Sequence, residues 1–437
     1  MERIIFHVDV NSAFLSWSAV KRLEEDPDAL DLRTIPSAVG GDVRTRHGVI
    51  TAKSIPAKKF GIKTGEPVVS AMRKCPGLIL VRADFEAYRK YSRAFLGVLN
   101  EYSDQVEQAS IDEAYIDMTQ ACRGWTDSAG KAGNIRDAAL CLADEIRRQV
   151  RERFGFTVNV GISSNKLLAK MASDFVKPDK THTLWPEEVE KKMWPLPIGD
   201  LYGCGEQTSN KLRKAGVLTI GDAARMDPHI LIYVLGQKAG DYIHRASCGI
   251  SQSPVKTQRE EAKSYSNEVT TSLDIRAENY HEEMPPLLKR LSEKVSQRMK
   301  KDEACGSVVF VSVKTAEFSR RSRQTRISSA SNDADLIFRT ASELMGQLLF
   351  GNEENPGLFD TAAGVRLVGV GMSGLEKGKT HQISIDDFLK EQEIVRREED
   401  ARRKEEEKKR GLEEMMRGVQ DKYGKGVLHK GPDRKKG

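Results

Sequence analysis

The N-terminal residues begin with an apolar run that ends at an acid. Residues 3–10 read Arg-Ile-Ile-Phe-His-Val-Asp-Val and predict a buried strand. Asn11 and Ser12 then offer an N-cap for a helix over about 13–23. Asp9 is therefore expected at the point where a buried strand turns into a helix.

An acidic pair interrupts the alternating apolar and polar positions of residues 106–118. Because this pattern is typical of half-buried strands, we interpret the stretch as a hairpin with Asp112 and Glu113 at its tip. Two adjacent carboxylates repel each other, and a divalent cation such as Mg²⁺ would compensate them. A solvated acidic turn is the alternative interpretation.

The patterns around this hairpin predict one α+β domain. Helical spacing covers 85–102 and 134–154, a strand covers 157–162, and a helix begins near Asn165. This order suits a ferredoxin-like sheet. If the first strand lies beside the hairpin, Asp9, Asp112 and Glu113 converge. Three carboxylates can hold two magnesium ions roughly 4 Å apart, as nucleotidyl transfer requires.

The second half of the chain predicts two further regions. Gly203 and Gly205 precede a helix in a pattern like a helix-hairpin-helix, which presents backbone N–H groups to DNA phosphates. An ordinary turn between helices is the alternative. A polar linker is expected over 250–262, followed by a β-α-β-β-α-β order over 263–375 that predicts a separate α+β domain.

A basic cluster falls where the middle strands of that last domain meet. We expect it to bind DNA phosphates without sequence preference, although a solvated loop would have the same composition. Its members are Lys314, Arg320, Arg321, Arg323 and Arg326.

Composition narrows the class of protein. A net charge of +6 over 437 residues permits a polyanionic partner without proving one. The six cysteines show no zinc spacing and predict reduced thiols in a cytoplasmic protein. No apolar window is long enough for a membrane span, and the first residues do not form a signal peptide. We therefore expect no membrane partner.

Four motifs occur in order along the chain. They are residues 9–14 (DVNSAF), 48–61 (GVITAKSIPAKKFG), the acidic hairpin, and 161–170 (GISSNKLLAK) with Lys177-Pro178. Together they resemble a Y-family DNA polymerase of the translesion class, in particular its bacterial polymerase IV branch. The resemblance extends from Met1 to about Leu375.

This resemblance implies a right-hand polymerase architecture. It implies a ferredoxin-like palm with small fingers over 1–185, the fingers being about 30–80. A helix-hairpin-helix thumb over 186–249 and the linker over 250–262 would follow. A separate α+β little finger would then occupy 263–375 and a charged tail 376–437.

The resemblance also assigns roles to residues. Asp9, Asp112 and Glu113 would be catalytic and, with the Val10 carbonyl, would bind two Mg²⁺ ions. The expected dNTP site comprises Ala13, Phe14, Thr51, Ile55, Lys58 and Lys177. Phe14 would lie under the sugar and exclude a 2′-hydroxyl; a core position is its alternative.

The fingers depart from the family pattern at two positions. The family has a tyrosine and an arginine that contact the triphosphate where this chain has Ile55 and Lys58. Lys58 keeps the charge without the bidentate fork, and Ile55 cannot donate a hydrogen bond. The alternative is that the lysines of 53–63 form only a solvated surface.

A further motif lies in the tail. Gln382, Ile385 and Phe388 resemble the peptide by which bacterial polymerases bind the sliding clamp, although a capped helix start would give a similar pattern.

These features lead to one expected function and two rivals. We expect error-prone translesion synthesis by a monomer that acts on primer–template DNA and dNTPs. A nucleotidyl cyclase on a similar sheet and a non-catalytic DNA- or clamp-binding protein are the alternatives.

Overall fold

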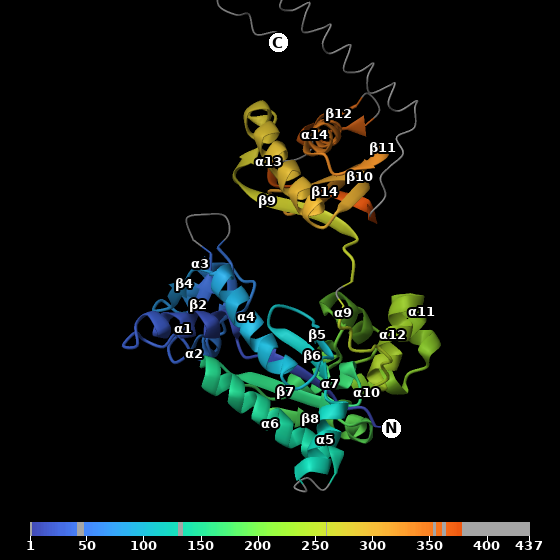
Figure 1. The fold of residues 1–437 in the computed structure, drawn as a ribbon. Helices are drawn as coiled ribbons and strands as arrows, with labels where there is room; N and C mark the ends of the chain where they lie inside the picture. The colour runs from blue at the N-terminus through green and yellow to red at the C-terminus, as the bar shows by residue number, and fades with distance from the viewer. Residues whose placement is uncertain are drawn as a thin grey trace, which may run out of the picture. The chain divides into compact units, whose positions relative to one another are not determined.

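A computed structural model describes residues 2–41, 48–129, 134–258, 260–352, 355–360 and 364–377. Contacts divide the chain into two compact units, Met1–Glu261 and Ala262 onward (Figure 1). The predicted clamp-binding residues Gln382, Ile385 and Phe388 lie outside the described residues, as does the predicted tail beyond residue 377.

A five-stranded sheet forms the centre of the first unit, with the strand order β5-β6-β1-β7-β8. The central strand β1 runs antiparallel to both neighbours, and β5 and β6 form the predicted hairpin. The strands are β1 (Ile5–Val10), β5 (Val106–Gln108), β6 (Glu113–Asp117), β7 (Val158–Ser163) and β8 (Thr181–Thr183).

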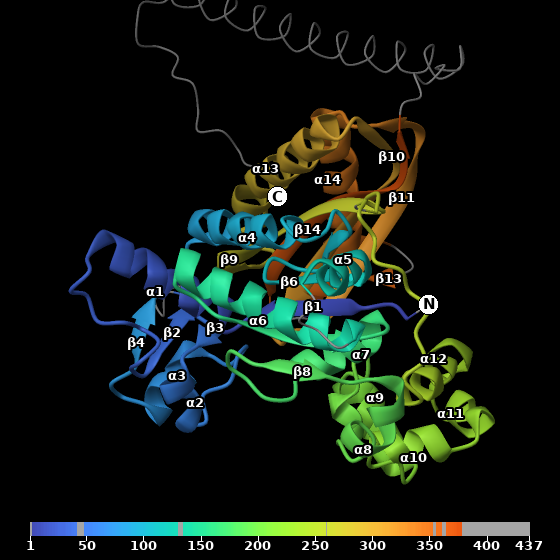
Figure 2. The same ribbon diagram turned by 60° about the horizontal axis from the view of Figure 1, so that its bottom comes forward.

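Side-chain alternation gives this palm sheet two different faces. Phe6 and Val8 point into a large core covered by helices, of which Figure 2 shows α4 and α6 along one side of the sheet. His7 lies on the other face, against α7. The helices are α1 (Ala13–Glu25), α4 (Phe85–Asn100), α5 (Thr119–Ala129), α6 (Ile135–Phe154) and α7 (Lys166–Ser173).

The start of α1 corrects one prediction. Ser12 does occupy the N-cap position, but its backbone is left-handed with φ of 48° and its side chain makes no capping hydrogen bond. The Ser16 hydroxyl instead donates to the carbonyl of Asn11 at 2.6 Å. Asn165 caps α7 as expected, accepting from the Leu168 amide.

A small three-stranded sheet with the order β3-β2-β4 forms the expected fingers region. The hydroxyl of Ser54 caps α2 by accepting from the Ala57 amide, and Pro56 lies in the first turn, where it is tolerated. The helix α3 was not predicted. The elements are β2 (Ser37–Gly40), β3 (Ile50–Lys53), α2 (Ile55–Lys59), α3 (Val68–Lys74) and β4 (Ile79–Val81).

Short helices with their own core complete the first unit. After these helices comes the predicted linker, which contacts the palm. Val255 packs against the palm, and the Lys256 amide donates to Glu107 at 2.6 Å. The helices are α8 (Val189–Lys192), α9 (Glu206–Lys214), α10 (Ile220–Arg225), α11 (Pro228–Leu235) and α12 (Gln237–Ser247), with 3-10 turns η1 (Pro186–Glu188) and η2 (Ile198–Asp200).

The second unit has the predicted β-α-β-β-α-β order and a separate core. Its antiparallel sheet has the order β11-β10-β14-β9. The main elements are β9 (Ser264–Ile275), α13 (Tyr280–Lys301), β10 (Ala304–Thr315), β11 (Arg320–Ser331), α14 (Ala334–Phe350) and β14 (Val365–Lys377). Smaller ones are β12 (Gly351–Asn352), β13 (Asn355–Pro356) and η3 (Leu358–Asp360).

Among the described helices of both units, none is long and apolar enough to cross a membrane.

Candidate active site

Strand register brings the predicted acids together at one end of the palm sheet. Asp9 on β1 lies opposite Glu113 on β6, and the Val10 amide donates to the Asp112 carbonyl at 3.0 Å. The Ser110 hydroxyl orders the hairpin tip, donating to Asp112 Oδ1 at 2.6 Å and accepting from the Glu113 amide at 3.1 Å. The hairpin interpretation of the acidic pair is therefore confirmed.

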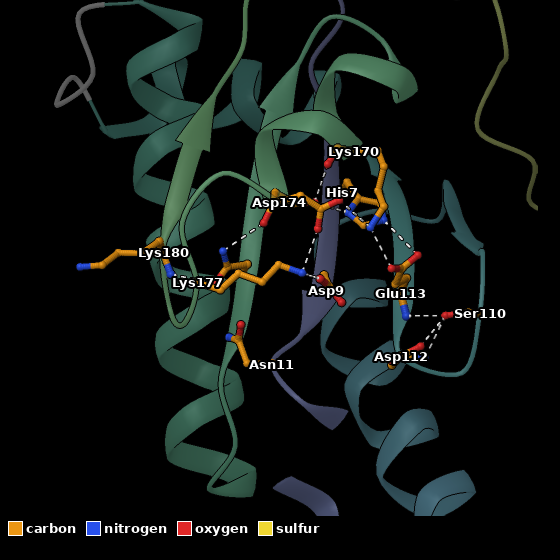
Figure 3. A network of polar contacts seen from close by, with 12 residues as sticks. His7, Asp9, Asn11, Ser110, Asp112, Glu113, Lys170, Asp174, Lys177 and Lys180 are labelled. Carbon is orange, nitrogen blue, oxygen red and sulfur yellow. Dashed lines mark hydrogen bonds and ion pairs between the residues drawn. The ribbon is translucent and has the colours of Figure 1, made fainter. Parts of the chain in front are cut away.

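Two lysines contact these carboxylates (Figure 3). Lys177 donates to Asp9 and also contacts Asp174 at 2.9 Å. Lys170, on α7, donates to Glu113 Oε1 at 2.8 Å and contacts Asp174 at 3.2 Å. Opposite charges thus alternate from Asp9 to Glu113 through the two lysines and Asp174.

Burial and neighbouring groups shift the pKa values of Asp9 and Glu113 in opposite directions. Burial raises the pKa of Asp9 above its usual value, although Lys177 opposes this effect. Neighbouring His7, followed by Lys170, lowers the pKa of Glu113 to about 2 despite partial burial. Both groups are therefore sensitive to the positive charges around them.

Asn159 fixes the loop that carries Lys177. Its side-chain amide donates to the carbonyls of Ser173 and Val176 at 3.1 and 2.7 Å, and its oxygen accepts from the Lys180 amide. Because Asn159 is fully buried and pairs with Asp9 in the register of β1 and β7, the loop is held directly above the acid.

One cavity of about 610 Å³ collects every residue that the sequence predicted for metal and nucleotide binding. These residues are Asp9, Val10, Ala13, Phe14, Thr51, Ile55, Lys58, Asp112, Glu113 and Lys177. The first-strand acid, the hairpin acids and the fingers lysine come from segments far apart in the chain, so only the fold brings them together.

Phe14 is held in the cavity wall by aromatic contacts. Its ring stacks on Tyr88 with centroids 4.8 Å apart and an interplanar angle of 18°. The Tyr88 hydroxyl lies 2.9 Å from the hydroxyl of Ser18. Phe14 is only half-buried, so part of its ring faces the cavity.

Sequence reasoning assigned no role to His7, Asn159, Lys170 or Asp174. Strand alternation could have placed His7 on the same face as Asp9, because the two residues are two positions apart. The contacts of Lys170 and Asp174 depend on how α7 packs, which no sequence pattern indicated.

The donor set suits a divalent cation. Carboxylates of Asp9, Asp112 and Glu113 line one end of the cavity, and hard oxygen ligands suit Mg²⁺. The buried carboxylate of Asp9 already attracts an ammonium group, that of Lys177. Within the described residues, no three His, Cys, Asp or Glu side chains lie close enough to hold a metal ion as they stand.

Comparison with known proteins decides the family. Residues 8–174 match the impB/mucB/samB family and residues 262–385 match its C-terminal domain. A DNA polymerase IV from Clostridium acetobutylicum is 38% identical, covering 89% of this chain and 91% of that protein. This chain belongs to the impB/mucB/samB family and is a Y-family DNA polymerase.

Other similar proteins agree with this assignment. A DNA polymerase IV 1 from Bacillus subtilis is 36% identical, covering 78% of this chain and 77% of that protein. A solved Y-family DNA polymerase chimera, Dbh-Dpo4(243-245)-Dbh, has a TM-score of 0.70 at 23% identity and covers 86% of this chain and 100% of its own. That structure confirms the predicted fold class of the polymerase.

In the turn that was predicted to contact DNA, position 203 requires glycine for structural reasons. Gly203 has φ of +86°, and a Cβ there would lie 2.5 Å from the Tyr242 hydroxyl oxygen. Gly205 is the N-cap residue of α9. The two residues therefore shape the turn before α9, which leaves its DNA contact a prediction.

The basic residues of the second unit lie where the two middle strands in chain order pair, as the sequence predicted. Lys314 and Arg320 do pair across the β10–β11 turn, but the other arginines extend along the edge strand β11. All four arginines lie on β11, which begins at Arg320, so the alternative of a solvated loop does not hold. Arg320 pairs with Glu268, while Arg321 and Arg326 are exposed.

Proposed function

We propose that this polymerase carries out template-directed, error-prone translesion synthesis by a two-metal mechanism. The observation that supports it most is the single cavity that joins the three carboxylates to Phe14, Lys58 and Lys177. The substrates would be a primer–template DNA and a dNTP.

Asp9, Asp112 and Glu113, with the Val10 carbonyl, would hold the magnesium ions. When bound, magnesium would favour deprotonation of the primer 3′-hydroxyl and neutralise charge on the triphosphate and the pyrophosphate leaving group. The carboxylates orient these groups, and Lys177 would transfer from Asp9 to the triphosphate. Asp174 would remain its second contact.

Phe14 would select deoxynucleotides. Because Tyr88 lies behind its ring, Phe14 could not easily retreat from a 2′-hydroxyl, and a ribonucleotide would clash. Error-prone copying would follow from small fingers and an open site, in which Ala13 of α1 and Ile55 of α2 line the cavity.

We propose the remaining partners on narrower support. The exposed arginines of β11 would bind the DNA backbone, and the peptide containing Gln382 and Phe388 would bind a sliding clamp. We also propose that the protein is a monomer and that it is cytoplasmic; its six free cysteines would suit a reducing compartment.

Primer extension on an undamaged template tests the proposal. With Mg²⁺ and dNTPs, we expect extension by the wild type and a loss of roughly a hundredfold or more for Asp112→Ala, because several kcal/mol of transition-state stabilisation would be lost. Asp104→Ala is the matched control, since Asp104 is an exposed acid near the same hairpin but outside the cavity.

The rivals predict other outcomes. A wild type that binds primer–template without extending it would favour a non-catalytic binding protein. Consumption of dNTPs or NTPs without any primer would favour a cyclase. Equal extension by Asp112→Ala would contradict the assignment of the carboxylates.

A further inference from the structure

Lys53 is a cavity residue for which neither the family pattern nor the sequence analysis assigned a role. It ends β3, and it lines the same cavity as Lys58 and Thr64. Its ammonium group donates to the Thr64 hydroxyl at 3.1 Å. Lys53 is half-buried, whereas Lys58 is exposed, so the two ammonium groups reach the cavity from neighbouring elements.

The positive charges of Lys53 and Lys58 are only weakly compensated by the carboxylates that the structure describes: Glu66 favours the charged form of Lys53 without forming an ion pair with it. Neither lysine forms an ion pair with any residue that the structure describes. The cavity's other basic groups differ: Arg33 pairs with Asp31, and Lys177 pairs with Asp9. Within the described residues, the cavity thus has a carboxylate end and, at the fingers, an end where two ammonium groups have no ion-pair partner.

Mutual repulsion at that end favours an anion. Burial lowers the pKa of Lys53 and the nearby charge of Lys58 lowers it further, while Glu66 only partly opposes these two effects. An anionic oxygen between the two ammonium groups would relieve both effects, because it replaces lost solvation and screens the repulsion. Ile55, which lies between them in the chain, has no donor to contribute.

We propose that Lys53 binds the triphosphate of the incoming nucleotide, together with Lys58. This inference rests on the proposed function and adds a third cationic contact to Lys58 and Lys177. The chemistry is that of a phosphate oxygen, which a dNTP and a DNA backbone share, so the test must distinguish the two.

Equilibrium binding of dCTP separates nucleotide affinity from catalysis. The full-length enzyme is held on a primer ending in a dideoxynucleotide, opposite a template guanine, with Mg²⁺ present. We expect Lys53→Met to raise the Kd for dCTP about tenfold, the usual effect of losing one hydrogen bond to a charged group. Lys53→Arg keeps the charge and should restore most of the affinity.

Lys59→Met is the matched control, because Lys59 is an exposed lysine of α2 that does not line the cavity. It should leave the Kd for dCTP unchanged. The Kd for primer–template, measured without dCTP, should be the same for the wild type, Lys53→Met and Lys59→Met.

Two results would overturn the inference. One is an unchanged Kd for dCTP in Lys53→Met. The other is weaker binding of primer–template with normal dCTP binding, which would assign Lys53 to the DNA backbone. Either result leaves the polymerase proposal intact, because that depends on extension by the wild type and its loss in Asp112→Ala.

Discussion

At the scale of the residue, the most informative feature is a buried acid held by a lysine. Asp9 is only 5% exposed, and its ionised carboxylate is paired with Lys177. Burial raises its pKa even so, which means that folding disfavours the charged form. Under the proposed mechanism the same carboxylate would bind a cation, which would explain why this cost is retained.

Asp9→Asn should therefore stabilise the metal-free protein while abolishing primer extension. At pH 7 we expect a gain of about 0.5–2 kcal/mol in the free energy of unfolding, measured by denaturant titration with a chelator present. Because the folded pKa of Asp9 is raised, the wild type loses stability as pH rises through that pKa, so the gain should vanish below about pH 4.

Asp104→Asn, which removes an exposed acid, should leave the free energy of unfolding unchanged. A less stable Asp9→Asn variant would mean that the ion pair with Lys177 more than offsets the burial of the carboxylate.

At the scale of the element, the close approach of α7 to β7 positions the site. A Cβ on Gly161 would lie 2.0 Å from the Ala169 carbonyl oxygen and 2.4 Å from the Ser173 nitrogen. Only glycine permits this distance, and both contacts are to backbone that cannot rotate away. The helix carries Lys170, and the loop carrying Lys177 follows it.

Gly161→Ala should consequently impair both stability and activity. Overpacking of this kind costs about 1–3 kcal/mol, and displacement of α7 should lower kcat as well. Denaturant unfolding and primer extension measure the two effects. Gly97→Ala is the control: its Cβ would meet nothing within 4 Å in the last turn of α4, so no loss and a gain of up to about 0.5–1 kcal/mol is expected.

A Gly161→Ala variant with normal stability would show that α7 can move away from the sheet at little cost. Normal activity in a destabilised variant would separate the position of α7 from catalysis.

At the scale of the whole molecule, the chain folds into two units with separate cores, and each unit carries a different set of candidate functional residues. The first contains the cavity, and the second presents exposed arginines along an edge strand. Charged edge strands also prevent sheets from pairing with one another, so the arginines have a structural reason to be there as well. Their DNA contact therefore needs its own measurement.

The salt dependence of primer–template binding provides that measurement. Arg321→Ala and Arg326→Ala should each reduce the slope of log K against log salt by about 0.9 if each arginine neutralises one phosphate. Lys289→Ala, which removes an exposed lysine of α13, should leave the slope unchanged. Unchanged slopes in both arginine variants would indicate that β11 is charged only to protect its edge.

The sequence by itself determined the elements and the identity of the key acids. Strands and helices follow local periodicity, so β1, the acidic hairpin and the β-α-β-β-α-β order were predictable. Boundaries and short elements were less so: α3 was missed, and the sequence did not indicate that β11 extends over the whole basic segment from Arg320. The Ser12 cap failed because its backbone is left-handed.

Tertiary structure alone decided which charges meet. Lys177 contacts Asp9 from 168 positions away, and Lys53 enters the cavity from the fingers. Val255 likewise packs against the palm from a segment that the sequence predicted only as a polar linker. These contacts depend on sheet register and on how closely α7 packs against the sheet. Neither property can be predicted from the periodicity of apolar residues in the sequence. Residue types thus fix the available chemistry, while long-range packing fixes which groups share a site.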